Sequence, residues 1–134
     1  MGRRSLVLMA AMAMLGGSAA AGGDPLAGYR WTSRVLVLAA GDADDPKLAA
    51  QRQALASAQA GAAERDLVTV EAVGPGEKAV ALRRHLGLSG ESFRAVLVGK
   101  DGGAKLTSDE PIPPQRLFTT IDAMPMRKDE AKRR

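Results

Sequence analysis

A short acidic loop carries the side chains of this chain that are best suited to chemistry: Asp42, Asp44, Asp45 and Lys47. Carboxylate oxygens bind hard cations, and a carboxylate beside a lysine could transfer protons. The spacing, however, is not that of an EF-hand calcium loop. Asp45 before Pro46 is instead typical of a residue that caps a helix. We therefore expect the loop to cap a helix, and we expect no metal and no cofactor.

The elements around this loop predict a parallel crossover. Arg34 to Ala40 is an aliphatic run, typical of a strand buried on both faces of a sheet. A helix should run from Pro46 to about Ala63. A second strand should run from Asp66 to Val73, nearer a sheet edge because polar residues partly alternate along it. A strand, helix and strand of this length predict a right-handed crossover with both strands parallel.

The second half of the chain predicts a helix, a hairpin and a last helix. The helix spans Glu77 to Leu86, and a tight turn at Lys100-Asp-Gly-Gly103 joins strands 93–98 and 104–107. Pro114 can open the last helix, which Pro125 should end or kink. The order β-α-β-α-β-β-α predicts an α/β fold on the thioredoxin-like plan, with a four-stranded mixed sheet flanked by helices.

The sequence departs from a redox thioredoxin at its reactive positions. Redox thioredoxins carry two cysteines in the loop after the first strand, whereas this chain has no cysteine at all. Disulfide exchange and thiol peroxidase chemistry are therefore excluded. The proline that precedes the third strand in such enzymes is missing too, since Glu91 and Ser92 occupy that neighbourhood.

We expect any binding site to lie where two loops meet at one end of the sheet. If strand 34–40 is central and strand 93–98 runs antiparallel beside it, the loop Asp42 to Lys47 meets Glu91 and Ser92. Acidic residues already occupy the field of the helix N-terminus there, so the cleft should prefer cationic or neutral partners. Trp31 should lie at the far end of the first strand, where we favour a role in closing one end of the core or in a short edge strand over a role as a wall of a binding cleft.

The first 21 residues predict an export signal. Arg3 and Arg4 precede an apolar run from Leu6 to Leu15, and small residues up to Ala21 supply a cleavage site. The charged n-region is too short to favour the twin-arginine route over the general export route. Residues 22–28 should form a flexible lead-in and 29–126 the domain, with no later membrane span. We expect a periplasmic or secreted protein.

The net charge of +4 is concentrated outside the predicted domain. Residues 127–134 carry five basic and two acidic side chains. We interpret this stretch as a solvated basic tail that could be deleted at little cost in stability. No aromatic residues interleave with the charges, so we expect no nucleic-acid partner.

Several short stretches resemble one family. Trp31 with Arg34-Val-Leu, Glu64-Arg-Asp-Leu-Val68, Val98 to Lys105, and Ile121 to Arg127 with Glu130 are similar to the bacterial DUF4174 domain. The resemblance covers about Tyr29 to Glu130 and implies a thioredoxin-like fold in an exported protein, with no agreed activity. It marks positions of unknown role: Trp31, Arg34, Arg65, Asp66, Lys100, Asp101, Lys105, Asp122, Met124, Pro125, Arg127 and Glu130.

Two functions remain open. The first is a non-catalytic binding or interaction module of the cell envelope, whose partner is an envelope or extracellular protein or a small ligand. The second is an enzyme with a carboxylate and lysine site in the loop Asp42 to Lys47. His85, the only histidine, lies between charged residues and a helix end, and we expect it to be solvated.

Overall fold

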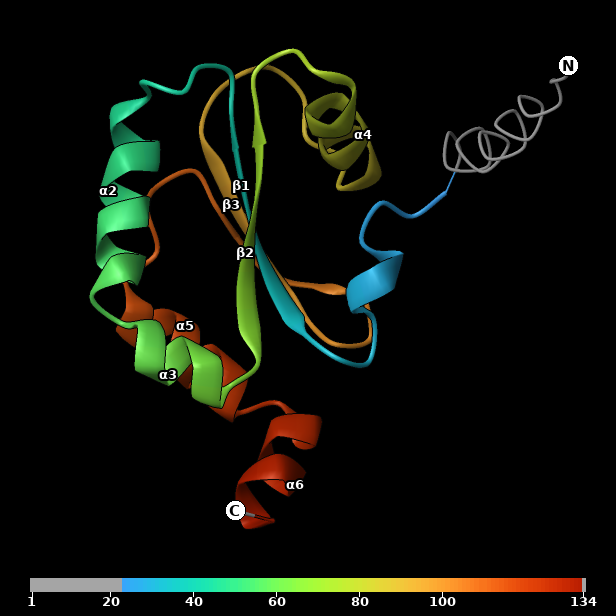
Figure 1. Ribbon diagram of the computed structural model, residues 1–134, viewed down its shortest axis with the longest axis vertical. Helices are drawn as coiled ribbons and strands as arrows, with labels where there is room; N and C mark the ends of the chain where they lie inside the picture. The colour runs from blue at the N-terminus through green and yellow to red at the C-terminus, as the bar shows by residue number, and fades with distance from the viewer. Residues whose placement is uncertain (1–22, 134) are drawn as a thin grey trace, which may run out of the picture.

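The computed structural model describes residues 23–133. The predicted export signal lies outside the described residues. A sheet in the order β2-β1-β3-β4 forms the centre of the molecule (Figure 1). Its strands are β1 (Arg34–Ala40), β2 (Leu67–Val73), β3 (Arg94–Val98) and β4 (Ala104–Ser108). β1 pairs parallel with β2 and antiparallel with β3, which confirms the predicted four-stranded mixed sheet.

Helices cover both faces of this sheet (Figure 1). One face carries α2 (Pro46–Ala56), α3 (Gln59–Glu64) and α5 (Pro114–Asp122), and the other carries α4 (Glu77–His85) and the 3-10 turn η1 (Ala27–Tyr29). All residues of β1 are buried, as predicted. Leu36 and Leu38 pack toward α2 and α5, whereas Val35 and Val37 pack toward α4. The first strand therefore separates two cores.

The helix predicted from Pro46 to Ala63 is interrupted at Ser57 and Ala58, which divide it into α2 and α3. The break lets α3 lean on α5. A Cβ atom at Gly61 would lie 2.6 Å from Cε2 of Phe118, closer than side chains tolerate. Gly61 is thus the contact point between the two helices, because only a residue without a side chain leaves room for the Phe118 ring.

The segment before Tyr29 packs on the domain, contrary to the predicted flexible lead-in. Leu26 is only 5% exposed and joins the core on the α4 side of the sheet. Asp24 accepts a hydrogen bond from the Leu26 amide and pairs with Arg30 and His85. His85 is exposed, as predicted, and its Nε2 lies 3.1 Å from Asp24 Oδ1. The domain begins before residue 29.

The basic tail is also part of the domain. α5 ends at Asp122, shortly before Pro125, as predicted. Pro125 then begins a further helix, α6 (Pro125–Lys132). Arg127 is 4% exposed and Glu130 is 9% exposed. Residues three apart on a helix share one face, and this pair faces the sheet end. The prediction of a solvated tail is wrong, because charge composition does not reveal which helix face is buried.

No helix among residues 23–133 combines the length and apolar character that a membrane crossing requires.

Candidate functional site

The predicted cleft at one end of the sheet does form. The amide of Gly41 donates a hydrogen bond to the carbonyl of Glu91 at 3.0 Å, which holds the two loops together. They enclose a shallow pocket of about 310 Å³, which we call the acidic cleft. Gly41, Asp42, Asp44, Asp45, Pro46 and Glu91 line it. The predicted residues Lys47 and Ser92 lie outside this lining.

Two of the three aspartates of the acidic cleft shape their own loop. Asp42 accepts a hydrogen bond from the Asp44 amide at 2.7 Å. Asp45 caps α2, as predicted, by accepting from the amides of Lys47 and Leu48. Within residues 23–133, no group of three or more acidic or histidine side chains is arranged to hold a metal ion.

Lys47 points to another part of the molecule. Its Nζ donates to Glu110 Oε2 at 2.7 Å and to the carbonyl of Asp109 at 3.2 Å. The hydrogen bond and charge of Glu110 raise the pKa of the Lys47 ammonium. A lysine with a raised pKa is a poor proton acceptor near neutral pH, so this pairing disfavours the predicted carboxylate and lysine chemistry.

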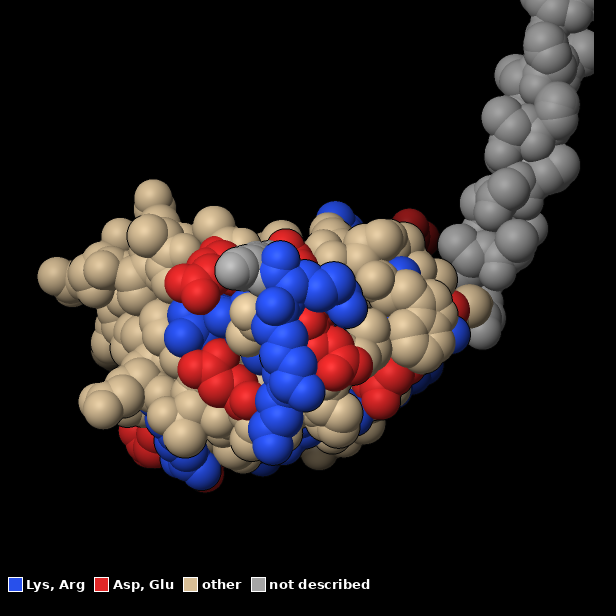
Figure 2. Space-filling model, turned by 90° about the horizontal axis from the view of Figure 1, so that it is seen from below, with Lys and Arg blue, Asp and Glu red and all other residues tan. Residues whose placement is uncertain are grey.

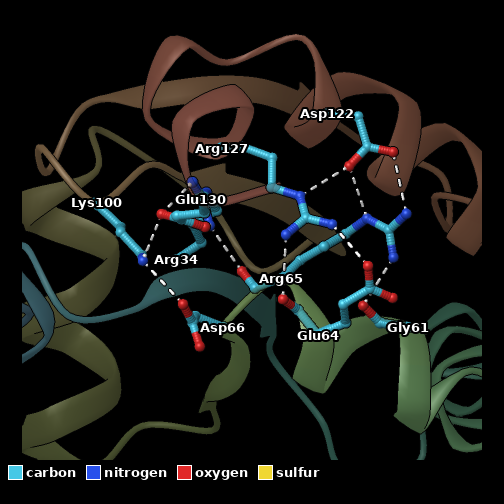
Figure 3. Close-up of polar contacts among 9 residues, drawn as sticks. All are labelled: Arg34, Gly61, Glu64, Arg65, Asp66, Lys100, Asp122, Arg127 and Glu130. Atoms are coloured by element: carbon cyan, nitrogen blue, oxygen red, sulfur yellow. Dashed lines mark hydrogen bonds and ion pairs between the residues drawn. The ribbon is translucent and has the colours of Figure 1, made fainter. Parts of the chain in front are cut away.

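Most of the remaining family-motif positions meet at the opposite end of the sheet (Figure 3). Arg34 is at the start of β1 and is 1% exposed. Its two terminal nitrogens contact the Glu130 carboxylate at 3.1 and 3.2 Å, and one also donates to the carbonyl of Arg65 at 2.8 Å. α6 therefore delivers a carboxylate to a guanidinium that the first strand buries.

Lys100 extends this contact to the β2 side of the sheet. It follows β3, and its Nζ donates to Glu130 Oε2 at 2.7 Å and to Asp66 Oδ2 at 2.9 Å. Burial alone would raise the pKa of Glu130, but the hydrogen bonds and charges of Arg34 and Lys100 outweigh burial and lower it to about 2. Glu130 is therefore ionised throughout the physiological range.

A second group of ion pairs lies beside the first (Figure 3). Asp122 accepts from Arg65 at 2.9 Å and from Arg127 at 3.2 Å, and Arg127 also reaches Glu64 at 2.9 Å. The hydrogen bond from Arg65, helped by Arg127, lowers the pKa of Asp122. We call the combined set the ion-pair network: Arg34, Glu64, Arg65, Asp66, Lys100, Asp122, Arg127 and Glu130.

The ion-pair network joins four cations to four carboxylates and is electrically balanced. Its members come from β1, the end of α3, the turns after α3 and β3, and both C-terminal helices. Figure 2 shows how basic and acidic side chains gather at the end of the molecule that α6 covers. This arrangement can lock α6 onto the sheet. The pKa values of Asp122 and Glu130 are lowered, whereas a general acid needs a raised pKa.

A pocket of about 420 Å³, here called the hairpin pocket, opens beside the ion-pair network. It lies between the β3–β4 hairpin and the junction of α5 with α6. Its lining consists of Arg34, Gly99, Lys100, Asp101, Lys105, Thr120, Ala123, Met124, Pro125 and Met126. The family-motif positions Asp101, Lys105, Met124 and Pro125 thus border a hollow that the sequence did not predict.

The turn of the hairpin has the geometry that its glycines predict. Gly102 has a φ of 87°, which favours glycine. Asp101 accepts from the Gly103 amide and from Lys105 Nζ, both at 2.9 Å. Both bonds lower the pKa of Asp101, the bond from the Gly103 amide more than the bond from Lys105. These bonds fix Lys105 at the rim of the hairpin pocket.

Trp31 lies at the same end of the sheet, as predicted, since its amide donates to the carbonyl of Lys100 at 2.7 Å. The side chain does not close the core, however, because it is 61% exposed. Its φ of 69° lies in the left-handed region, which bulky residues seldom adopt. The left-handed backbone turn before β1 therefore directs the Trp31 side chain, and packing against the core does not.

The chain belongs to the family described as "Domain of unknown function (DUF4174)", whose model matches residues 25–130. The match includes Glu130 and so nearly the whole of α6. Searches of curated proteins and of solved structures found no similar protein.

Proposed function

We propose that this protein is a non-catalytic binding module that holds a small ligand in the hairpin pocket. The observation that carries the proposal is the position of that pocket, which six family-motif positions border: Arg34, Lys100, Asp101, Lys105, Met124 and Pro125. The hairpin contributes Lys100, Asp101 and Lys105 to the lining, and the α5–α6 side contributes Thr120 and the apolar run Ala123, Met124, Pro125 and Met126. Small-molecule sites commonly combine an apolar wall with a few placed polar groups.

The ion-pair network supports this role because it fixes the orientation of two side chains that line the pocket. Arg34 and Lys100 belong both to the network and to the pocket lining. Their carboxylate partners hold them in one orientation before any ligand arrives. Groups that are already oriented lose less entropy on binding, so the network favours recognition over structural change.

We also propose that the scaffold is thioredoxin-like. The support is the element order, in which a parallel crossover precedes an antiparallel hairpin and a final helix. Residues 43–47 stand where redox members carry cysteines, so the scaffold would serve binding alone. Export is proposed from residues 1–21. The intact mass of the protein from an envelope fraction tests it, and a full-length mass in the cytosol contradicts it.

A fragment screen followed by backbone NMR tests the proposed function. The full chain is titrated with neutral, cationic and anionic fragments of similar size. We expect saturable amide shifts at residues 99–105 and 123–126. Shifts confined to residues 41–48 and 89–93 would move the site to the acidic cleft, where we expect cationic or neutral ligands. Absence of shifts in both regions for every fragment would overturn the proposed function.

The alternative, an enzyme with a carboxylate and lysine site, has weaker support. Asp45 is occupied as a helix cap, and Lys47 is paired with Glu110. Turnover of a fragment during the same screen, abolished by substitution of Asp42, would favour this alternative.

A further inference from the structure

We propose that the ligand of the hairpin pocket is a carboxylate attached to a compact apolar body. This inference rests on the proposed function, because it specifies the ligand class of the same pocket. Three observations carry it: the free hydrogen-bond donors of the lining, the distribution of charge around them, and the apolar opposite wall.

The lysines on the polar side of the pocket keep unused hydrogen-bond donors. A protonated lysine has three N–H donors. Among the described residues, Lys100 Nζ uses two, for Asp66 and Glu130, and Lys105 Nζ uses one, for Asp101. The hydroxyl of Thr120 donates to the carbonyl of Arg116. A ligand that supplies acceptor oxygens would satisfy the donors that remain.

The charged residues that line the pocket also favour a negatively charged ligand. The cations Arg34, Lys100 and Lys105 line the pocket, with Asp101 as the one carboxylate in its lining. Glu130 and Asp66 neutralise Arg34 and Lys100 from outside this lining. Arg34 and Lys100 are almost fully buried and act through their charge, whereas the side chain of Lys105 is 34% exposed and can contact a negative group directly.

Arg34 strengthens this preference. Its Nε is buried and has no hydrogen-bond partner among the described residues. The guanidinium is held in place by Glu130 and the Arg65 carbonyl, so its positive charge is fixed behind the lining of the pocket and attracts a negative group without contacting it.

The opposite wall selects the rest of the ligand. It consists of Ala123, Met124, Pro125 and Met126, and Met126 is among the exposed large hydrophobic residues. Methionine side chains adapt to apolar groups of different shape. An inorganic anion would leave this wall bare, and a hydrocarbon would leave the donors unpaired. The volume of about 420 Å³ suits a compact ligand, since small-molecule sites span roughly 300–1,000 Å³.

A matched titration tests the ligand class. The full chain is titrated with hexanoate, hexan-1-ol and hexylamine, which share one alkyl chain and differ in the head group. We expect hexanoate to give the tightest binding, with amide shifts at residues 99–105 and 123–126. Lys105→Gln should weaken hexanoate roughly tenfold, the effect of one charge-assisted hydrogen bond, and leave hexan-1-ol unchanged. Lys78→Gln, at an exposed lysine on α4, is the matched control.

Two peptides distinguish the sources of such a carboxylate. An acetylated Ala-Ala-Leu with a free C-terminus is compared with the same peptide as its amide. Binding of the acid alone, more tightly than hexanoate, identifies a peptide C-terminus; weaker binding than hexanoate identifies a free carboxylic acid.

The outcomes separate the two proposals. Equal affinity for hexan-1-ol and hexanoate, or hexanoate binding that Lys105→Gln leaves intact, overturns the carboxylate inference and keeps the pocket as a binding site. Failure of every fragment and both peptides to shift the pocket amides overturns the proposed function as well.

Discussion

Arg34 and Glu130 decide whether the first strand can be buried along its whole length. A buried guanidinium is unfavourable unless a carboxylate and hydrogen bonds compensate it. Glu130 supplies both terminal contacts, and the carbonyl of Arg65 supplies a third. The pair is therefore needed for the position of α6 as well as for the start of β1.

Glu130→Gln should destabilise the protein by about 3 kcal/mol at neutral pH, because it leaves two buried cations without their shared carboxylate. Urea unfolding followed by circular dichroism measures the change. Asp129→Asn is the matched control at an exposed neighbour on α6, and should stay within about 0.5 kcal/mol. Equal effects of the two variants would contradict the role of the buried pair.

Gly61→Ala should cost about 1–3 kcal/mol, the range for overpacking a tight contact. The added Cβ would meet the Phe118 ring at 2.6 Å. Gly28→Ala is the control, since a Cβ at Gly28 has no atom within 4 Å. Thermal unfolding of both variants provides the comparison. A Gly61→Ala variant as stable as the parent would show that α3 is not held against α5.

Single residues were predictable from sequence where their role is local. Asp45 caps α2, and Gly102 has the expected positive φ. Trp31 was not predictable, because a left-handed backbone turn holds its side chain in solvent. Only the family resemblance indicated that Arg34 is a notable position. An arginine before an aliphatic run usually marks a strand boundary. Its burial depends on Glu130, which is 96 positions away in the sequence.

At the scale of elements, α6 is the main departure from expectation. From the sequence we predicted that the helix beginning at Pro114 ends or kinks at Pro125. We interpreted the charged residues beyond it as a solvated tail. Proline is equally suited to the first turn of a helix, and it serves that role in α6. The strands and their pairing were predictable from aliphatic runs and one tight turn. The helix break at Ser57 was not predictable, because it accompanies a contact between Gly61 of α3 and Phe118 of α5, which are far apart in the sequence.

Deletion of residues 127–134 should lower the free energy of unfolding by at least about 3 kcal/mol, because it removes the carboxylate of a buried ion pair. This reverses the expectation for a solvated tail. Deletion of residues 131–134 alone keeps Arg127 and Glu130 and should cost less than about 1 kcal/mol. Denaturant unfolding of the two truncated chains is the measurement. Similar stability of both would mean that α6 contributes nothing.

For the whole molecule, stability should depend on pH through the ion-pair network. The pKa of Glu130 falls from 4.5 to about 2 on folding, and the pKa of Asp122 is lowered as well. A carboxylate with a depressed folded-state pKa stabilises the protein fully above its unfolded pKa, and this contribution is lost as the pH falls through the folded value.

Unfolding measured at about pH 7, 5 and 3 should therefore show little change over the first interval and a loss over the second. The contribution of Glu130 corresponds to about 3 kcal/mol if fully lost, and Glu130→Gln should flatten the profile. A parent and variant with parallel profiles would show that Glu130 does not control acid stability.

The distance along the chain between Arg34 and Glu130 has a consequence for the timing of folding. β1 is synthesised early, whereas the carboxylate that neutralises its first residue is 96 positions later. A growing polypeptide on the ribosome cannot bury Arg34 with its partner until the last helix has emerged. Native structure around Arg34 is thus completed only after α6 has been synthesised, and chains that terminate before Glu130 remain open to aggregation and proteolysis.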